Sequence, residues 1–288
     1  MFRLSDQACL LNDQYKDASN FNARFQLHER FSVNRHGWLS WVLDHICLSP
    51  ESRILELGCG PGMLWLKNLH RIPAGWRVTL TDLSPGMVEE ARKNLRDSGR
   101  PFQFGVADAQ SVPFKDARFD AVIANHMLYH VPDRERAFSE IRRVLKRGGR
   151  LYASTVGKGH MREMNDLVKR FNPQWDLDLP STSNSFLLEN GAGQIARWLL
   201  GVSLHRYEDA LVVTEAGPLI AYILSSGGMS AAIGNRVAEF THFVEEEIAH
   251  RGAIRISKDS GLFGAYKTPA GRAETNTRAA HRKPEEPG

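Results

Sequence analysis

SRILELGCGPG, residues 52–62, joins a short apolar run to a turn that contains three glycines. A short apolar run of this kind, bounded by turn residues, is typical of a strand buried inside a sheet. Gly58, Gly60 and Gly62 lack side chains, so a ligand can approach the bare backbone of the turn. Open α/β sheets bind ligands at the carboxyl ends of their strands, where this turn would lie. The stretch therefore predicts an α/β sheet with a binding site at the end of its first strand.

The residues that follow alternate strand patterns with amphipathic helical patterns as far as residue 156. This succession predicts a doubly wound, mostly parallel sheet with right-handed crossovers. Ser84 and Asp133 are in place to cap two of the helices. We expect strands at residues 52–58, 76–82, 102–108, 119–125 and 150–156, and helices at residues 64–70, 84–99 and 133–149.

The alternation is absent on both sides of this core. Residues 1–50 look helical, and residues 157–200 look mostly helical and irregular. Residues 216–235 carry no charge over about the length of a membrane span. Pro218 and the pair Gly227-Gly228 interrupt them, so we expect two buried helices with a turn between them.

The carboxyl-terminal part combines strand and helix patterns with a polar end. Residues 203–214 look like a strand, and apolar residues at helical spacing follow between 233 and 248. Residues 254–268 suggest a hairpin that turns at residues 258–261. The last twenty residues are polar and contain Pro and Gly, so we expect a disordered tail.

The composition is that of an ordinary globular protein, with 42% hydrophobic and 24% charged residues among 288. The net charge is +4 and the pI about 9.0, but the basic residues are scattered, unlike the basic patch of a dedicated nucleic-acid binder. Cys9, Cys47 and Cys59 lack metal-type spacing and favour a reducing compartment. Since no signal peptide is visible, we expect a soluble, cytoplasmic protein without a membrane segment.

Acidic residues lie at the ends of the first three predicted strands. Asp82 closes the second strand, where a carboxylate can accept from both hydroxyls of a ribose, and Asp108 could accept from an adenine amino group. Met63 stands where the dinucleotide fingerprint requires its third glycine, and no Gly-Lys-Ser/Thr of a phosphate loop follows. Together with Glu56 in the first strand, this pattern favours a cationic or neutral nucleoside over a phosphorylated one.

Five ordered motifs resemble those of class I S-adenosylmethionine-dependent methyltransferases of the small-molecule, type 11-like group. They are ILELGCGPG, the acid that ends TLTD, ADAQSVPF, FDAVIANHMLYHVPD and RVLKRGGRLYAST. The resemblance implies a Rossmann-like, doubly wound sheet of seven strands with a reversed last strand, plus helical lid insertions. It also implies that S-adenosyl-L-methionine is the cofactor and lies over the glycine-rich turn.

The resemblance assigns residues to each part of the cofactor. Those of the turn would line the methionine and ribose portion: Glu56, Gly58, Cys59, Gly60 and Gly62, with Cys59 as a small filler and not a nucleophile. Asp82 would hold the ribose hydroxyls, and the adenine would be contacted by Leu83, Met87, Asp108 and Ala109. The sulfonium end would meet Asn125 and His126, and an N-terminal segment would close over the cofactor with Tyr15, Arg24 and His28.

The same resemblance suggests how the chain is divided. Residues 1–50 would form an N-terminal helical lid, and residues 51–156 the S-adenosylmethionine-binding core. Residues 157–268 would supply helical insertions and the last strands, which together form the acceptor pocket, and residues 269–288 the tail.

NHMLYHVPD, residues 125–133, spaces His126 and His130 so that both could lie on one helical face. A zinc protease motif would need Glu where Met127 stands, so we expect no metal. We take His130, Tyr15 and His126 as candidate catalytic residues, with His130 contacting the acceptor or removing its proton. A packed, structural histidine is the alternative reading for His126, His130 and His28.

We expect methyl transfer to a small organic acceptor by direct in-line displacement, because a sulfonium already carries an excellent leaving group. The protein must then align the acceptor and exclude water. A base is needed only where the acceptor loses a proton early. Two alternatives stay open: an RNA methyltransferase, suggested by the basic tail, and a protein that binds the cofactor without transferring its methyl, as a sensor or cyclase. We expect no nucleic-acid partner, and a homodimer stays open.

Overall fold

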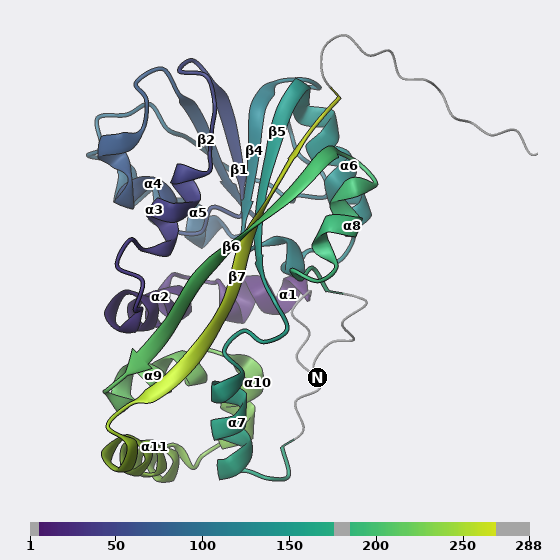
Figure 1. The fold of residues 1–288 in the computed structure, drawn as a ribbon. Coiled ribbons are helices and arrows are strands. Elements are labelled where there is room, and N and C mark those ends of the chain that lie inside the picture. The colour runs from purple at the N-terminus through teal and green to yellow at the C-terminus, as the bar shows by residue number, and fades with distance from the viewer. Residues whose placement is uncertain (1–5, 176–184, 269–288) are drawn as a thin grey trace, which may run out of the picture.

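A seven-stranded sheet runs through the computed structural model, which describes residues 6–175 and 185–268 (Figure 1). The strand order is β3-β2-β1-β4-β5-β7-β6. β1 to β5 are parallel to one another, and β7 runs antiparallel to both β5 and β6. The predicted doubly wound sheet with a reversed last strand is confirmed. The strands are β1 (Arg53–Leu57), β2 (Arg77–Asp82), β3 (Gln103–Val106), β4 (Phe119–Asn125), β5 (Leu145–Val156), β6 (Leu200–Val213) and β7 (Ile254–Tyr266).

Helices cover both faces of the parallel part of the sheet. On one face, α3 (Trp38–Asp44), α4 (Met63–Lys67) and α5 (Pro85–Leu95) enclose a core that includes the fully buried Trp65 (Figure 1). On the other face, α6 (Arg134–Val144) and α8 (Gly191–Ala196) enclose a second core around Phe138. A short 3-10 helix, Leu69–Arg71, follows α4, and a second, Leu128–His130, precedes α6.

Two helix starts follow directly from local sequence. The Ser84 hydroxyl accepts a hydrogen bond from the Met87 N–H at 3.2 Å, and Pro85 occupies the first turn of α5. The Asp133 carboxylate accepts from the Arg136 N–H at 3.0 Å and caps α6. Both caps fix where a helix leaves the carboxyl end of the sheet.

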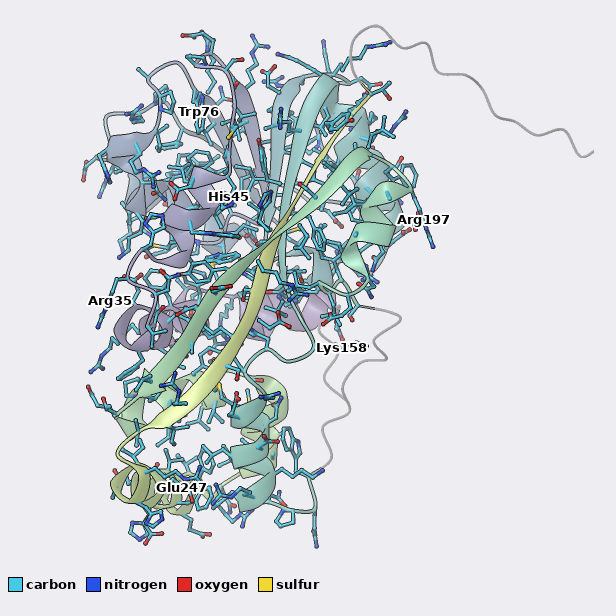
Figure 2. The ribbon with its side chains drawn as sticks, in the orientation of Figure 1. Arg35, His45, Trp76, Lys158, Arg197 and Glu247 are labelled. Carbon is cyan, nitrogen blue, oxygen red and sulfur yellow. The ribbon has the colours of Figure 1, made fainter. Side chains whose placement is uncertain are left out.

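A third core packs against the carboxyl-terminal end of β6 and the amino-terminal end of β7. It is closed by α2 (Ser19–Phe31), α7 (Arg162–Phe171), α9 (Ala216–Leu224), α10 (Gly227–Ile233) and α11 (Val237–Arg251). Figure 2 places Trp76, beside β2, and Glu247, on α11, at opposite ends of the molecule. The chain before α2 forms α1 (Gln7–Cys9) and a π-helix, Leu10–Gln14.

The uncharged stretch 216–235 forms two helices, as expected. α9 and α10 meet at an angle of 109°, and their apolar residues Leu219, Ile223 and Ile233 are buried in the third core. Across residues 6–175 and 185–268 no single helix has the length and apolarity to cross a membrane, although this bent pair passes that test together.

Three local predictions were wrong. The hairpin expected at 254–268 is one continuous strand, β7, because β5 and β6 pair with it on both sides and satisfy its polar middle. The helix expected to run to Gly149 ends at Val144, because Leu145 already pairs with Phe119 of β4. The helical spacing across residues 233–248 is broken at Gly234, whose φ of +58° ends α10 before α11 begins. The predicted tail, residues 269–288, lies outside the described residues.

Candidate functional site

A cavity of about 770 Å³ opens over the carboxyl ends of β1 to β4. Its wall includes the glycine-rich turn, the segment after β4, and residues from α2, α9, α10 and β7. Sites for small molecules and cofactors commonly have this size. The fold therefore brings together, in one cavity, residues that are up to 253 positions apart, such as Gln7 and Ser260.

The glycine-rich turn has a backbone that other residues adopt rarely. Gly58, Gly60 and Gly62 have φ values of +64°, +53° and +76°. A Cβ on Gly58 would lie 2.7 Å from the Cβ of Met127, which is too close, whereas a Cβ on Gly60 would meet only Phe21, at 3.9 Å. Gly60 lines the cavity, so a ligand can lie directly against its backbone.

Asp82 is fixed by the turn that it follows. Its two carboxylate oxygens accept from the N–H groups of Gly60 and Ser84, both at 2.9 Å. Burial raises the pKa of this carboxyl, while these backbone hydrogen bonds oppose the rise. The carboxylate keeps lone pairs for a ligand in the cavity that it lines.

Glu56 is almost completely buried, with 2% of its surface exposed. Burial raises the pKa of its carboxyl to about 8, although the Trp65 indole N–H donates to it at 2.5 Å and lowers the pKa. The nearby Asp82 adds to the rise. The Glu56 carboxyl is therefore mostly protonated at neutral pH in the free protein.

Asp108 follows β3 at the other side of the cavity. Burial works against ionisation there, but hydrogen bonds from the backbone and side chain of Gln110, and from the Gln7 amide at 3.1 Å, lower its pKa overall. Ala109 is buried beside it. The other residues expected around an adenine, Leu83 and Met87, also line the cavity.

The N-terminal segment crosses the cavity and is tied to both sides of it. The Ser84 hydroxyl donates to the Tyr15 carbonyl at 2.6 Å, and the Arg24 guanidinium donates to the Ser225 carbonyl at 2.6 Å. Arg24 also donates to the Tyr15 hydroxyl at 3.4 Å, and that hydroxyl lies 3.0 Å from His130 Nε2. Arg24, Tyr15 and His130 thus form a continuous chain of polar contacts.

The segment after β4 brings both histidines of NHMLYHVPD to the cavity wall. His126 has a left-handed backbone, with φ of +53°, and its N–H donates to Ser154 Oγ at 2.9 Å. The Ser154 hydroxyl in turn donates to the Asn125 side chain. Burial lowers the pKa of His126 to about 4, helped by the charges of Lys258 and His130, so its ring is neutral at pH 7.

The remaining candidates lie at the same cavity with different surroundings. His28 lies edge-on to Tyr222, with ring centroids 5.8 Å apart, and burial lowers its pKa. Cys59 is buried, which raises the pKa of its thiol and fits a filler better than a nucleophile. Within the described residues, no three His, Cys, Asp or Glu side chains come together as a metal site would require.

Several residues of the cavity were not predicted from the sequence, among them Lys258, His160 and Trp38. Lys258 was assigned to a hairpin turn, His160 lies in a segment predicted to be irregular, and Trp38 lies in the region 1–50, which was predicted only to be helical. The ring of Trp38 packs against that of His126 with centroids 4.9 Å apart. Only the pairing of β6 with β7 and the position of α3 show that these residues line the cavity.

Comparison with known proteins identifies the core. Residues 55–153 match the family described as a methyltransferase domain. These residues thus form a methyltransferase domain that is similar to the class I S-adenosylmethionine-dependent methyltransferases. The residues matched include the glycine-rich turn, Asp82, Asp108 and the segment after β4, which all meet at the cavity.

Curated relatives are similar over this methyltransferase core. A ubiquinone/menaquinone biosynthesis C-methyltransferase of Vibrio cholerae is 31% identical over 137 residues, which are 47% of this chain and 53% of that protein. A malonyl-[acyl-carrier protein] O-methyltransferase of Erwinia pyrifoliae is 30% identical over 179 residues, 60% of this chain and 64% of that protein. The chain thus spans about half to two thirds of the length of these relatives.

Solved structures share the fold of this chain at low sequence identity. A putative methyltransferase of Bacillus halodurans has a TM-score of 0.55 and 16% identity, covering 80% of this chain and 98% of that one. The phosphoethanolamine N-methyltransferase 2 of Haemonchus contortus, solved with S-adenosylhomocysteine, has a TM-score of 0.57 and 18% identity, covering 93% and 61%. A [4+2]-cyclase has a TM-score of 0.51 and 22% identity, covering 80% of each chain.

The cofactor that this methyltransferase family implies is S-adenosylmethionine, and the chemistry of the cavity fits it. Its amino and sulfonium groups are cationic, and the cavity offers the carboxyl groups of Glu56, Asp82 and Asp108 at the ends of three strands. Gly60 leaves its backbone open to a bulky nucleoside.

Proposed function

We propose that this protein binds S-adenosylmethionine and transfers its methyl group to a small organic acceptor by direct in-line displacement. The observation that carries the proposal is the extent of the cavity. It begins at the strand ends that bear Glu56 and Asp82 and continues past His126 and His130 to residues of α9, α10 and β7. A cofactor over the glycine-rich turn would leave the second part for an acceptor.

The proposed cofactor contacts follow the geometry of the wall. Asp82 would hold the ribose hydroxyls, since its carboxylate is already oriented by two backbone N–H groups. Asp108 and the backbone at Ala109 would contact the adenine edge. The methionine portion would lie along the turn near Glu56, and the sulfonium end near Asn125 and His126: all of these residues line the cavity.

The lid and pocket assignments are part of the same proposal. Residues 1–50 would close over the cofactor, held down by the bonds of Tyr15 to Ser84 and of Arg24 to Ser225. The bound cofactor would supply an activated methyl group on a sulfonium leaving group. The chain would align the acceptor with that methyl at about 3–3.5 Å and exclude water. Residues 157–268 would surround the acceptor.

A proton that the acceptor must lose would leave through Tyr15. Burial raises the pKa of Tyr15, so its phenol is protonated at neutral pH. In the tautomer that leaves His130 Nε2 unprotonated, the Tyr15 hydroxyl would donate to this nitrogen, 3.0 Å away, while its oxygen accepts from Arg24. Tyr15 would take the proton of the acceptor as it passes its own to His130. His126, with a pKa of about 4, would contact the acceptor without acting as an effective base.

Calorimetry with S-adenosylmethionine tests the first half of the proposal. We expect binding to the full chain and about 10–100-fold weaker binding to Asp82→Asn, which loses charge-assisted hydrogen bonds to the ribose. Asp120→Asn is the matched control, because Asp120 binds Lys146 and lies outside the cavity wall. No binding to the wild-type chain, or equal binding to both variants, would refute cofactor binding at this site.

A turnover assay tests whether the protein transfers the methyl group to a small organic acceptor. The protein is incubated with metabolite pools and S-adenosylmethionine, S-adenosylhomocysteine release is followed, and mass spectrometry finds the compound that gains one CH₂ group. Cofactor that stays intact while another compound is transformed would contradict methyl transfer and favour a non-transferring protein, as the fold shared with a [4+2]-cyclase allows. Salt-sensitive methylation of RNA would instead overturn the small-molecule acceptor.

A further inference from the structure

The two ends of the cavity differ in charge. The carboxyl groups of Glu56, Asp82 and Asp108 lie at the strand ends where we place the cofactor. The only other carboxylate among the described lining residues is Glu29, which is half-exposed and paired with Lys67 at 2.6 Å. The opposite end, at β7, presents Lys258 and His160. One end therefore suits a cation, and the other end suits an anion.

Lys258 is held so that its charge faces the cavity. It lies directly across from Asp209 of β6, and its ammonium group donates to that carboxylate at 2.7 Å. The two side chains are 6% and 0% exposed. Lys258 lines the cavity, whereas Asp209 does not. An ammonium group has three donors, so N–H groups remain for a ligand after the bond to Asp209.

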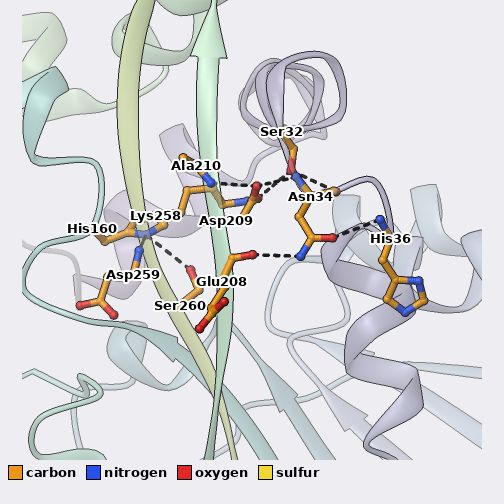
Figure 3. A network of polar contacts seen from close by, with 10 residues as sticks. All are labelled: Ser32, Asn34, His36, His160, Glu208, Asp209, Ala210, Lys258, Asp259 and Ser260. Atoms are coloured by element: carbon orange, nitrogen blue, oxygen red, sulfur yellow. Dashed lines mark hydrogen bonds and ion pairs between the residues drawn. The ribbon is translucent and has the colours of Figure 1, made fainter.

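Besides Lys258, three further donors bind the Asp209 carboxylate. It accepts from the Ser32 hydroxyl at 2.6 Å, from the Asn34 N–H at 3.0 Å and from the Ala210 N–H at 2.8 Å (Figure 3). These bonds hold the carboxylate ionised and fixed, and they fix Lys258 through it. The pair therefore anchors an ammonium group at the cavity wall.

His160 adds a neutral donor beside this ammonium group. Its Nδ1 accepts from the Asp259 N–H at 3.1 Å, as Figure 3 shows. Burial lowers the pKa of His160 to about 3, so its ring is neutral, and the acceptor role of Nδ1 places the one ring proton on Nε2. The ring lines the cavity, and the nearby charge of Lys258 contributes to the lowered pKa.

Aromatic side chains line the cavity that contains these two donors. Trp38 packs against His126, and Tyr129 and Tyr222 line the same cavity. A ligand that reaches Lys258 and His160 would therefore place its body against flat, apolar surfaces.

We propose that the acceptor is a small carboxylic acid with an apolar body, whose carboxylate binds to Lys258 and His160 while its body lies against Trp38. This inference rests on the proposed function, because it fills the part of the cavity that the cofactor leaves. A carboxylate suits the site better than a phosphate monoester. The latter carries about −1.5 to −2 charges at pH 7, and the charge of Lys258 is already offset by Asp209.

Sodium benzoate is the probe, titrated by NMR into the full chain saturated with S-adenosylhomocysteine. Benzamide has the same shape without the charge, and phenyl phosphate has the larger charge. We expect benzoate to bind more tightly than both. We expect Lys258→Met to weaken it about tenfold or more, because a charge-assisted hydrogen bond is lost, and His160→Phe to weaken it less.

Two further variants keep the test decisive if Lys258→Met fails to fold because Asp209 is left unpaired. Asp209→Asn combined with Lys258→Met removes both charges and should also lose benzoate binding. Lys146→Met removes a lysine that pairs with Asp120 away from the cavity, and should keep it.

The outcomes separate this inference from the proposed function. S-adenosylhomocysteine affinity is measured first and should change less than about threefold in these variants. If S-adenosylhomocysteine binds but benzoate binds no better than benzamide, or binds Lys258→Met unchanged, the carboxylate site is wrong and cofactor binding stands. Tighter binding of phenyl phosphate would overturn the carboxylate in favour of a phosphorylated acceptor. If S-adenosylhomocysteine itself does not bind, the proposed function fails.

Discussion

Glu56 is a buried carboxyl group at the end where we place the cationic part of the cofactor, and we predict that cofactor binding makes it release a proton. In the free protein its pKa is about 8, mainly because burial disfavours the charged form. At pH 7 this leaves about ten protonated groups for each ionised one, so about nine-tenths are protonated. A cation brought close would reverse that preference.

The number of protons that Glu56 releases follows from how far its pKa shifts. An opposite charge within about 4–6 Å lowers a carboxyl pKa by about 1–3 units, which would bring Glu56 from about 8 to about 5–7. The ionised fraction at pH 7 then rises from about one tenth to between one half and nearly all. We therefore expect Glu56 to release about 0.4–0.9 proton at pH 7 and less than about 0.1 at pH 9, where it is already ionised.

Calorimetry in buffers with different ionisation enthalpies measures this release. Titrations of S-adenosylmethionine into the wild type and into Glu56→Gln are compared, so that titration of the cofactor itself cancels. The Gln side chain keeps an acceptor for the Trp65 indole N–H. A difference between the two proteins below about 0.2 proton at pH 7 would show that Glu56 is ionised beforehand or does not meet the cation, and would refute the reasoning.

The other predictions concern the turn, the Tyr15 contact and acid stability. Gly58→Ala should lower the free energy of unfolding more than Gly60→Ala. Both substitutions strain a left-handed backbone, but only the Cβ at position 58 would lie 2.7 Å from a neighbouring side chain. Urea unfolding should give free energies for the two variants that differ by about 1–3 kcal/mol. Once an acceptor is known, Tyr15→Phe and His130→Ala should each lower kcat, by up to about 10²-fold for an acceptor that loses a proton. The double variant should lose little more activity than either single variant, because both residues serve one proton route. Additive losses would contradict that shared route. Because the pKa of His126 is about 4 when folded and 6.5 when unfolded, the unfolded state takes up more protons between these values. His126 should therefore lower stability on acidification from pH 6.5 to 4, and its own contribution is at most about 3 kcal/mol. His126→Gln should flatten that dependence, and an equally steep fall in the variant would exclude His126 as its cause.

Local signals were sufficient for much of the core. The turn glycines need left-handed backbone angles, and the caps Ser84 and Asp133 need only residues within three positions. Asp82 was placed beside the turn because parallel strands end at the same edge of a sheet. Gly58, Gly60, Asp82 and Ser84 all line one cavity, whereas Gly62 and Asp133 lie outside its wall. Contacts of these residues with the cofactor stay a prediction.

Pairing between strands that are distant in sequence determined the secondary structure at two places where local patterns predicted it wrongly. The sequence around Lys258 contains the Asp, Ser and Gly of a typical turn, yet these residues lie inside a strand because β6 and β5 pair with it on both sides. The end of α6 was missed for the same reason, since Leu145 gains a partner in Phe119 by leaving the helix. Neither partner is near in sequence, so no periodicity could indicate it.

The sequence by itself determined the sheet and the cofactor end of the cavity, because strand periodicity, glycine conformation and capping depend on neighbouring residues. Only the tertiary structure decided the other end. Lys258 and Asp209 are 49 positions apart, and His160 and Asp259 are 99 apart. These partners come together only when β6 and β7 pair. Burying the charge of Lys258 costs free energy unless its partner Asp209 is present.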